Sequence, residues 1–282
     1  MRDANVFAFR KAMPRMSWSP RNLYNLWRRS CGAEAEAIDF TRSPKTLFQQ
    51  RWISKALVRA YHGDFINEKI FKRWYLPDTL PDVRPRQHAP SSNGDLDAFA
   101  GRTEHLERRK KKASDEQRKG LAPVGSLMLA EVERRIDVFI FRCCFAHSVY
   151  EARRLVVHGS VLLNGKKHTN ANARLAPGDM VSVDPAAIRF LQEPESTQSS
   201  LTPFQPSSIC VSFPTCSAIY VRHPTARPGY SEIPTPYDAD GEVIRLAWEW
   251  YAKMRPRTRS KKQMAREPEN RSKTQLHPHR PL

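Results

Sequence analysis

The sequence has no long apolar run. Nowhere in its 282 residues does a stretch approach the roughly 20 apolar residues that a membrane-spanning helix requires. The class of membrane-spanning proteins is therefore excluded, and we expect no membrane span. Binding to a membrane surface is the one form of membrane contact that stays open.

Cysteine is scarce and shows no pairing pattern. The cysteines form an odd set without a C-x-x-C pair, and none has a histidine at zinc-finger spacing. We therefore expect no metal site and a reducing compartment. Two of them lie in an apolar helical pattern, where free thiols behave as small buried hydrophobic groups. The five residues are Cys31, Cys143, Cys144, Cys210 and Cys216.

Signatures of catalysis are missing as well. The chain has no P-loop, no nucleophile elbow and no pair of carboxylates in an apolar setting. We expect His147, His158 and His168 on the surface or facing RNA, rather than as metal ligands. The sequence therefore predicts that the protein is no enzyme, with no catalytic residue, no cofactor and no small-molecule substrate.

Acidic residues are too few to balance the basic ones. The chain carries 47 Lys and Arg against 29 Asp and Glu, a formal charge of +18. Such self-repulsion favours a polyanionic partner, which is nucleic acid or an anionic surface. The first thirty residues hold one acid, Asp3, among seven basic side chains. This composition suits a mitochondrial transit segment or a basic RNA-binding arm, and both stay open.

Composition divides the chain into four segments. Residues 1–86 are basic and rich in aromatic residues, which we expect to form a small helical core, with stacking on RNA bases as the alternative. Residues 87–124 combine proline, serine, glycine and charge, and indicate a flexible linker. Residues 125–186 form a periodic module, and residues 187–282 form a proline-rich extension. The extension is predicted to contain a helix over 242–255 and a basic tail.

The module has strong local signals. Leu129, Val132, Ile136, Phe139 and Cys143 recur at helical spacing, and predict one amphipathic helix. A second helix begins at Ser148, with Glu151 completing a capping box, and ends at Gly159. Asn164-Gly165 predicts a two-residue hairpin turn, and a turn at Pro177-Gly178-Asp179 precedes a strand over 180–183. The predicted class is α+β, with two helices packed on a small antiparallel sheet between a helical N-terminal region and an extended C-terminal one.

The motifs of the module closely resemble the S-four RNA-binding domain. The match includes Arg134-Arg135-Ile136-Asp137, Ser148-x-x-Glu151-Ala152-Arg153, His158-Gly159, Asn164-Gly165-Lys166 and Pro177-Gly178-Asp179. The resemblance implies a positive face that binds structured ribosomal RNA. Val149 stands where the family usually has an arginine, so Arg154 or His158 is expected to replace that contact. The predicted RNA-binding residues are Arg134, Arg135, Arg142, Ser148, Arg153, Arg154, His158, Lys166 and Lys167.

Both flanks of the module also resemble ribosomal members of this family. Arg15-Met16-Ser17-Trp18-Ser19 and the segment from His223 to Pro236 are similar to mitochondrial members of fungal type. The resemblance implies a structural constituent of the mitochondrial small ribosomal subunit. Its expected partners are small-subunit rRNA and neighbouring small-subunit proteins. Two alternatives stay open, an RNA-modifying enzyme or synthetase with an appended module, and a factor that visits the ribosome.

Overall fold

The computed structural model describes residues 13–30, 40, 43–80, 107–108, 111, 122–189, 208–238, 241–254 and 267–270. Most of the predicted linker and most of the predicted basic tail lie outside the described residues. The first twelve residues of the basic N-terminal segment lie outside them too. Among the helices that are described, none is long and apolar enough to cross a membrane.

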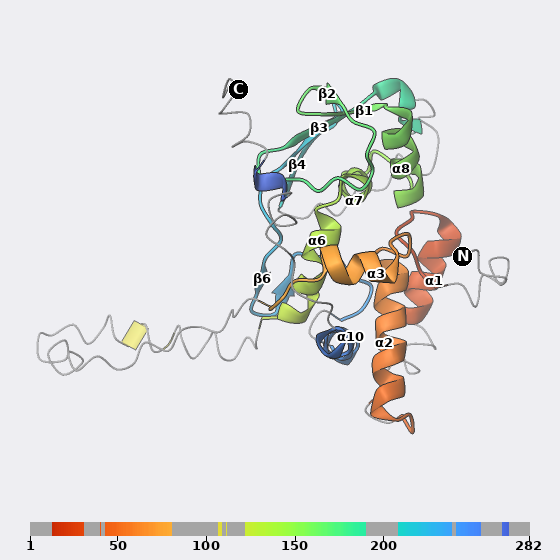
Figure 1. Ribbon diagram of the computed structural model, residues 1–282, viewed down its shortest axis with the longest axis vertical. Helices are drawn as coiled ribbons and strands as arrows, with labels where there is room; N and C mark the ends of the chain where they lie inside the picture. The colour runs from red at the N-terminus through yellow and green to blue at the C-terminus, as the bar shows by residue number, and fades with distance from the viewer. Residues whose placement is uncertain are drawn as a thin grey trace, which may run out of the picture.

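Two apolar cores organise the molecule, stacked one above the other (Figure 1), and the helix that contributes to both is α7 (Ile136–Arg142). The first core joins the N-terminal helices to parts of the chain more than a hundred residues away. Its elements are α1 (Pro20–Ser30), α2 (Leu47–Tyr61), α3 (Glu68–Ile70), the π-helical turn η2 (Phe71–Tyr75), the 3-10 helix η3 (Val124–Leu129), α6 (Ala130–Glu133), the hairpin of β6 (Ala226–Arg227) and β7 (Tyr230–Ser231), and α10 (Glu242–Lys253).

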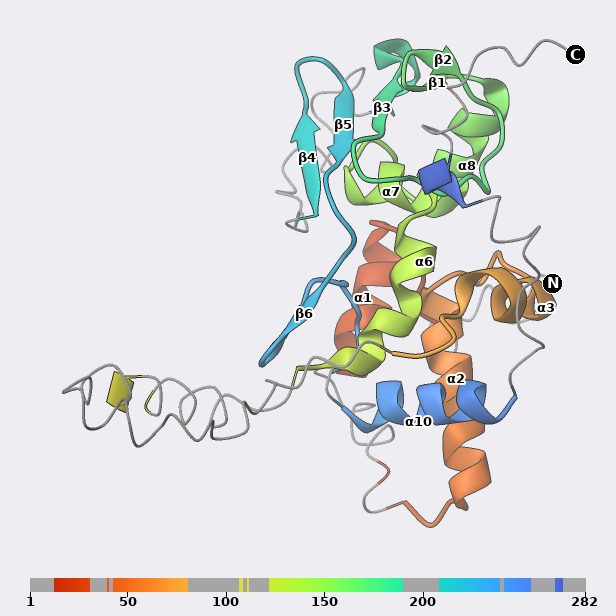
Figure 2. The ribbon, with the colours of Figure 1, turned by 60° about the vertical axis from the view of Figure 1, so that its left-hand side comes forward.

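Helices α2 and α10 cross at the centre of the first core (Figure 2). Thr46 begins α2 through a capping box with Gln49, because each side chain accepts a hydrogen bond from the other residue's backbone N–H. Trp250 of α10 meets Trp52 of α2 edge to face, at 5.2 Å between ring centroids. At the edge of the same contact, Arg51 and Glu249 form an ion pair of 2.7 Å.

The second core lies between two helices and one face of a five-stranded antiparallel sheet. The sheet has the order β2-β1-β3-β5-β4. Asn164 and Gly165 both have positive φ, as the predicted two-residue hairpin turn requires. The elements are α7 (Ile136–Arg142), α8 (Val149–His158), β1 (Val161–Leu163), β2 (Lys166–Lys167), β3 (Met180–Val183), β4 (Ile209–Ser212) and β5 (Ser217–Tyr220), with the 3-10 helices η4 (Pro185–Ala187) and η5 (Pro268–Asn270) at the margins.

The predicted single helix that opens the module is wrong. The chain forms η3 and α6, breaks at Arg134 and Arg135, and starts again as α7. Arg135 is extended, with φ −71° and ψ 142°. Its neighbours bond to a distant strand-like segment, because Ile136 donates to the Ala173 carbonyl and Leu175 donates to the Arg134 carbonyl. These tertiary hydrogen bonds outweigh the local helical preference.

The C-terminal extension does not form a separate unit. Residues 208–221 add the hairpin of β4 and β5 to the sheet of the module, and α10 packs on the N-terminal helices. The division of the chain into four consecutive segments therefore describes composition, whereas the packing interleaves the segments. The expected α+β class, with helices in the N-terminal region and an antiparallel sheet in the module, is confirmed.

The helix predicted over 242–255 is present as α10, with a corrected buried face. Ile244, Ala247 and Tyr251 are buried as predicted, while Trp250 replaces the predicted Trp248 as the more buried tryptophan. Met254, also predicted to lie on the core stripe, is exposed. The stripe ends one turn early because α10 ends at Lys253, and Met254 follows it as the C-cap residue with a non-helical backbone.

Truncating Tyr251 should destabilise the first core far more than truncating Met254 on the same helix. Tyr251 is fully buried against Phe71, and Tyr251→Ala should lower the free energy of unfolding by about 3–5 kcal/mol. Met254→Ala, the matched control, should change it by less than about 0.5 kcal/mol. Urea denaturation of both variants measures the difference. Similar losses of stability in both would contradict the packing of α10.

Candidate nucleic-acid interface

Helix α8 is fixed at both ends by its own sequence. The Ser148 hydroxyl accepts a hydrogen bond from the Glu151 N–H at 3.2 Å, as expected for an N-cap. The Glu151 carboxylate accepts from the His147 N–H at 2.9 Å, one residue earlier than in the predicted capping box. Gly159 ends the helix with φ +79°, a left-handed conformation that favours glycine.

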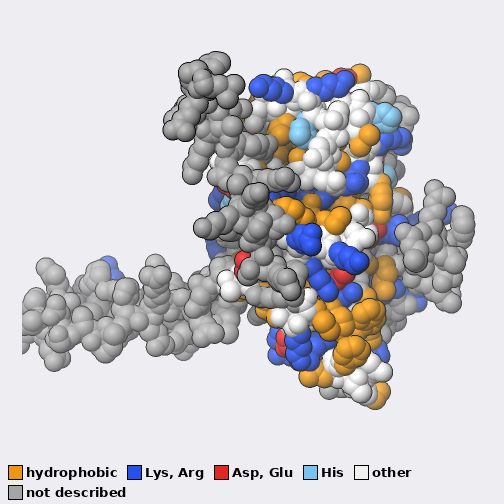
Figure 3. All heavy atoms as spheres, viewed as in Figure 1, with side chains coloured by type: hydrophobic (Ala, Val, Ile, Leu, Met, Phe, Trp, Pro, Cys, Tyr) orange, Lys and Arg blue, Asp and Glu red, His pale blue; other side chains and the backbone are white. Residues whose placement is uncertain are grey.

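The two sides of α8 have opposite character, as the sequence predicted. Ala152, Leu155 and Val156 are buried in the second core. Arg154 and His158 lie one helical turn apart on the exposed side. Figure 3 shows Lys and Arg side chains over the upper, middle and lower parts of this side of the molecule, and an apolar patch near its lower end.

The hairpin of β1 and β2 continues the basic surface past the end of α8. Lys166 and Lys167 are both exposed. A Cβ built on Gly159 would lie 2.1 Å from the Cε of Lys167, so the lysine passes directly over the end of the helix. The absence of a side chain at Gly159 makes room for it. We call Arg153, Arg154, His158, Lys166 and Lys167 the α8 face.

Arg153 lies at the inner margin of the α8 face. Its guanidinium donates to Asp137 at 2.6 Å and to the side-chain oxygen of Asn172 at 3.3 Å. It packs over the Phe65 ring, with 5.1 Å between the guanidinium carbon and the ring centroid. Its side chain keeps 28% of its surface exposed, so one edge of the guanidinium remains available to a phosphate.

Arg135 is held inside the protein. Its guanidinium makes two hydrogen bonds to Asp137, at 3.0 and 2.6 Å, and one to Asn172 at 2.8 Å. It also donates to the Tyr75 hydroxyl and stacks between the rings of Tyr75 and Phe65. Only 1% of the residue is exposed. These contacts make Arg135 a link between the module and the N-terminal helices.

Arg142 belongs to a second buried cluster, formed with Glu133 and His62. It pairs with both carboxylate oxygens of Glu133, at 2.8 and 3.0 Å, and donates to the Pro234 carbonyl at 3.2 Å. Burial alone would raise the pKa of Glu133, but the charge and the hydrogen bonds of Arg142 lower it to about 2. Burial lowers the pKa of His62, whose Nδ1 lies 3.3 Å from Glu133 without hydrogen-bond geometry. The imidazole is therefore neutral at pH 7.

Arg134 is the third buried arginine among the predicted RNA contacts. It pairs with Glu131 at 2.6 Å and with Glu269 of η5, and donates to the Leu175 carbonyl at 3.1 Å. Arg174 holds the other oxygen of Glu131 at 2.7 Å. These ion pairs bind residues 267–270 back onto the module.

Four of the nine residues predicted to contact RNA, three buried arginines and a helix cap, have partners within the protein. Arg134, Arg135 and Arg142 are buried, at 5%, 1% and 6% exposure, and their guanidinium groups are already paired with carboxylates. Little of their donor surface reaches solvent, and these contacts hold parts of the fold together. The Ser148 hydroxyl is likewise engaged as a helix cap. The prediction of RNA contact stays for the five residues of the α8 face.

Two basic residues that the motif did not include lie beside α8. Arg189 is largely exposed and pairs with Glu151 at 2.9 Å. Arg15 pairs with Asp64 at 3.2 Å, and Asp64 also accepts the Tyr150 hydroxyl at 2.5 Å. Residues 16–18 reach this place by pairing with residues 147–149 in a short antiparallel bridge. Nothing in the spacing of Arg15 could have predicted its closeness to α8, since the bridge joins residues 131 positions apart.

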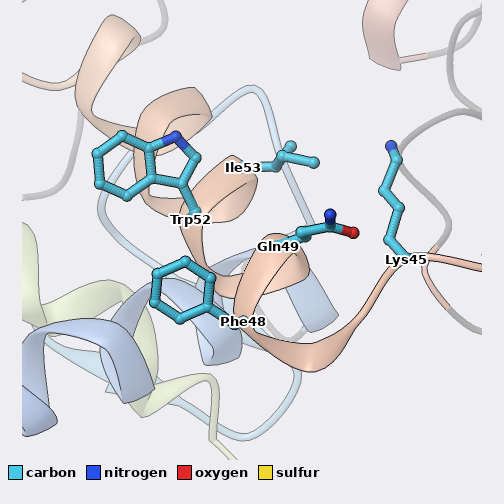
Figure 4. Close-up of a pocket in the computed structure, with 5 residues that line it drawn as sticks. All are labelled: Lys45, Phe48, Gln49, Trp52 and Ile53. Carbon is cyan, nitrogen blue, oxygen red and sulfur yellow. The ribbon is translucent and has the colours of Figure 1, made fainter.

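The described part of the chain offers little support for metal binding or for a small-molecule site. It contains no group of three or more His, Cys, Asp or Glu side chains that could hold a metal ion. A shallow pocket of about 340 Å³ opens at the start of α2, with Phe48 and Trp52 on one side and Lys45 on the other (Figure 4). Gln49 in its lining serves the capping box of α2. The pocket is thus a surface hollow between helix side chains.

Comparison with known proteins agrees with this geometry. Residues 134–181 match the S4 domain family. The small ribosomal subunit protein uS4m of Schizosaccharomyces pombe is 26% identical, over 88% of this chain and 80% of that protein. The uS4 proteins of Rickettsia felis and Rickettsia prowazekii are 31% and 30% identical, over 43% of this chain and 56% of each protein.

The helix pair and sheet of the second core are therefore built around an S4 domain, the class of module that the motifs predicted. Because the similarity to uS4m extends over most of this chain, it also includes both flanks of the module. The chain therefore resembles small ribosomal subunit proteins well beyond the S4 domain itself.

Removing the buried arginine at 135 should cost stability, whereas removing an exposed arginine should not. Arg135→Ala leaves the buried Asp137 with a cavity where its main partner was, and should lower the free energy of unfolding by about 3–5 kcal/mol. Arg154→Ala, the matched control on the α8 face, should change it by less than about 0.5 kcal/mol. Chemical denaturation of the two variants separates the roles. If the Arg135→Ala variant is as stable as the wild type, Arg135 would again be a candidate for RNA contact.

Acid should destabilise the protein through His62. The folded pKa of His62 lies below its ordinary value of 6.5, so the unfolded chain binds a proton that the native state does not. The free energy of unfolding should therefore fall as the pH drops below about 6.5, a slope that His62→Gln should reduce. Glu133 does not lower the free energy of unfolding in this pH range. Its stabilising contribution is lost only below the ordinary carboxylate pKa, toward its folded pKa of about 2. Met254→Ala, at an exposed position without a titratable group, is the control and should keep the wild-type slope.

Proposed function

We propose that this protein is a structural constituent of the mitochondrial small ribosomal subunit, where it binds small-subunit rRNA through the α8 face and supports subunit assembly. The observation that carries the proposal is the exposed basic surface along α8 and its hairpin, within an S4 domain. The relatives are named as small ribosomal subunit proteins, and the uS4m relative aligns over most of this chain. We propose no catalytic role and no small-molecule substrate.

The shape of the α8 face suits a helical RNA backbone. A helix of ten residues is about 15 Å long, and the hairpin lysines extend the positive surface beyond its end. A-form RNA hides its base edges in a deep major groove, so the side chains would contact phosphates and 2′-hydroxyl groups. The supporting residues Ser148, Gly159 and Asn164 fix the backbone on which the cations are mounted. The face is therefore rigid before RNA binds.

The whole-chain charge supports the same proposal. A formal charge of +18 is unfavourable in a compact protein unless a polyanion neutralises it, and rRNA supplies that charge. The mitochondrial compartment follows from the uS4m relative and agrees with the basic start of the chain. Neighbouring small-subunit proteins are the second class of partner that we propose.

Substitutions on the α8 face should weaken rRNA binding and reduce its dependence on salt. We expect Arg154→Ala and the double change Lys166→Ala/Lys167→Ala to reduce the slope of log K against log salt by about 0.7 to 0.9 for each phosphate that the variant no longer neutralises. Filter binding of the full chain to small-subunit rRNA, between about 50 and 200 mM salt, measures it. The control is Arg245→Ala, an exposed arginine of α10 on the first core.

Two outcomes would contradict the proposal. Binding that is independent of salt, or slopes that are equal in all variants, would exclude the α8 face as the site of phosphate contact.

Sedimentation of purified subunits tests the structural role, because a core constituent stays with the subunit after a high-salt wash. A protein that the wash removes would instead be a factor that visits the ribosome.

A further inference from the structure

Among the residues that the structure describes, no element covers the outer face of the sheet of the second core. Helices α7 and α8 cover the inner face, so side chains along β1, β3 and β5 alternate between buried and more exposed positions. The outward positions are apolar to an unusual degree for an exposed sheet, with Ile219 43% and Val221 48% exposed. The exposed apolar residues of this face are Leu162, Met180, Cys210, Ile219 and Val221, and we call them the outer stripe.

The strand register makes the outer stripe continuous. Met180 of β3 lies directly opposite Ile219 of β5, and Ile219 lies directly opposite Cys210 of β4. Side chains at paired positions are about 5 Å apart at Cβ, which is contact distance for residues of this size. Val221 follows Ile219 by two residues and projects from the same face. Leu162 of β1 pairs with Ser182 of β3, and therefore lies diagonal to Met180. The stripe therefore crosses four strands.

The outer stripe is neutral in a strongly basic chain. Its neighbours at the paired outward positions of the described strands are Ser182, Ser212 and Ser217, and the cation paired with a member of the stripe is Lys167, opposite Leu162 at the edge of the sheet. RNA binding depends on neutralising phosphates with Lys and Arg, which this face does not offer. An exposed apolar strip of this kind is a protein-docking surface.

The adjoining edge of the sheet indicates what form the partner takes. Within the described residues β4 pairs with β5 alone, so its other side presents open backbone groups. The Val221 N–H donates to the Ser208 carbonyl at 2.9 Å, so the backbone groups of Ser208 face β5. Successive residues of a strand direct their backbone groups to opposite sides, so the N–H groups of Ile209 and Val211 face the open edge. Natural sheets usually protect an edge with charge, proline or a bulge, and Ile-Cys-Val-Ser has none of these. An extended polypeptide is the partner that satisfies such an edge.

We propose that an extended segment of a neighbouring small-subunit protein adds to β4 as a sixth strand, with apolar side chains over the outer stripe. The proposal rests on the proposed function, since it assumes that the chain is part of the subunit. It assigns the two exposed surfaces of the S4 region to different partners, with RNA on the α8 face and protein on the outer face of the sheet. Hydrogen bonds at Ile209 and Val211 would supply the register, and Ile219 and Met180 would supply the apolar contact.

Cys210 provides a native probe of this surface, because its thiol is exposed in the middle of the outer stripe. The first measurement compares alkylation by N-ethylmaleimide in the free full-length protein and in purified small subunits, read by mass spectrometry of the peptide that contains Cys210. We expect the thiol to react in the free protein and to react at least an order of magnitude more slowly in the subunit. Fully reactive Cys210 in subunits that contain the chain would overturn the docking surface alone. A chain absent from the subunits would refute the proposed function as well.

Photocrosslinking identifies the occupant. A benzophenone side chain placed at position 219 should crosslink, in purified subunits, to one extended segment of another small-subunit protein. Crosslinks to rRNA, to a second copy of this chain or to its own residues 190–207 would each overturn the proposal. The uncharged probe keeps the apolar character that docking needs.

Two variants separate strand addition from unspecific apolar contact. Val211→Pro removes an outward N–H without removing a bond between β4 and β5, and Ile219→Lys places a charge in the stripe. Both should restore Cys210 alkylation in the subunit to the rate of the free protein, while rRNA affinity of the free protein changes less than twofold. Met254→Lys, an exposed apolar position on α10, is the control and should leave Cys210 protected. Protection retained in both test variants would contradict the sixth strand, and Ile219→Lys decides if Val211→Pro does not fold.

Discussion

A layer of buried ion pairs holds the two cores in one arrangement. Glu133 of α6, Arg142 of α7 and His62 after α2 meet where the cores join, and Asp137 binds Arg135 and Arg153 on the next side of α7. A buried charge without its partner is very costly, so neither cluster can separate easily. α7 itself is buried all round, with Val138 and Phe141 in the first core and Phe139 and Ile140 in the second. The direction in which the α8 face points is therefore fixed by the N-terminal helices.

Local sequence signals predicted the elements that need no distant partner. Ser148 and Gly159 mark the two ends of α8, and Asn164-Gly165 marks the hairpin, because caps and two-residue turns depend on neighbouring backbone. The resemblance to the family added the class of the module and its positive face. The break before α7 could not be predicted this way, since it depends on hydrogen bonds to residues 173–175. The same limit applies to the arginines, because Arg135 meets Tyr75 across 60 positions and Arg134 meets Glu269 across 135.

Arginine suits the junction between the cores for physical reasons that differ from RNA binding. Its planar guanidinium donates along several directions at once, so Arg135 can bond Asp137, Asn172 and Tyr75 while it stacks between aromatic rings. A lysine would make fewer directed bonds and would lose its hydration in the interior. A motif position occupied by arginine in an RNA-binding module therefore does not by itself indicate contact with RNA. Whether the guanidinium is buried or exposed distinguishes an arginine that stabilises the fold from one that can contact RNA.

This distinction changes how the charge of the module should be counted. Residues 134–168 carry seven basic and two acidic side chains, but Arg134, Arg135 and Arg142 are buried against carboxylates. Four cations remain at the surface, Arg153, Arg154, Lys166 and Lys167, and all lie on the α8 face. Long-range attraction to RNA must then depend also on basic residues outside the motif, among which Arg15 and Arg189 lie beside α8. The outer stripe, in contrast, has almost no charge to attract RNA, so the fold itself separates a surface suited to phosphate from a surface suited to protein.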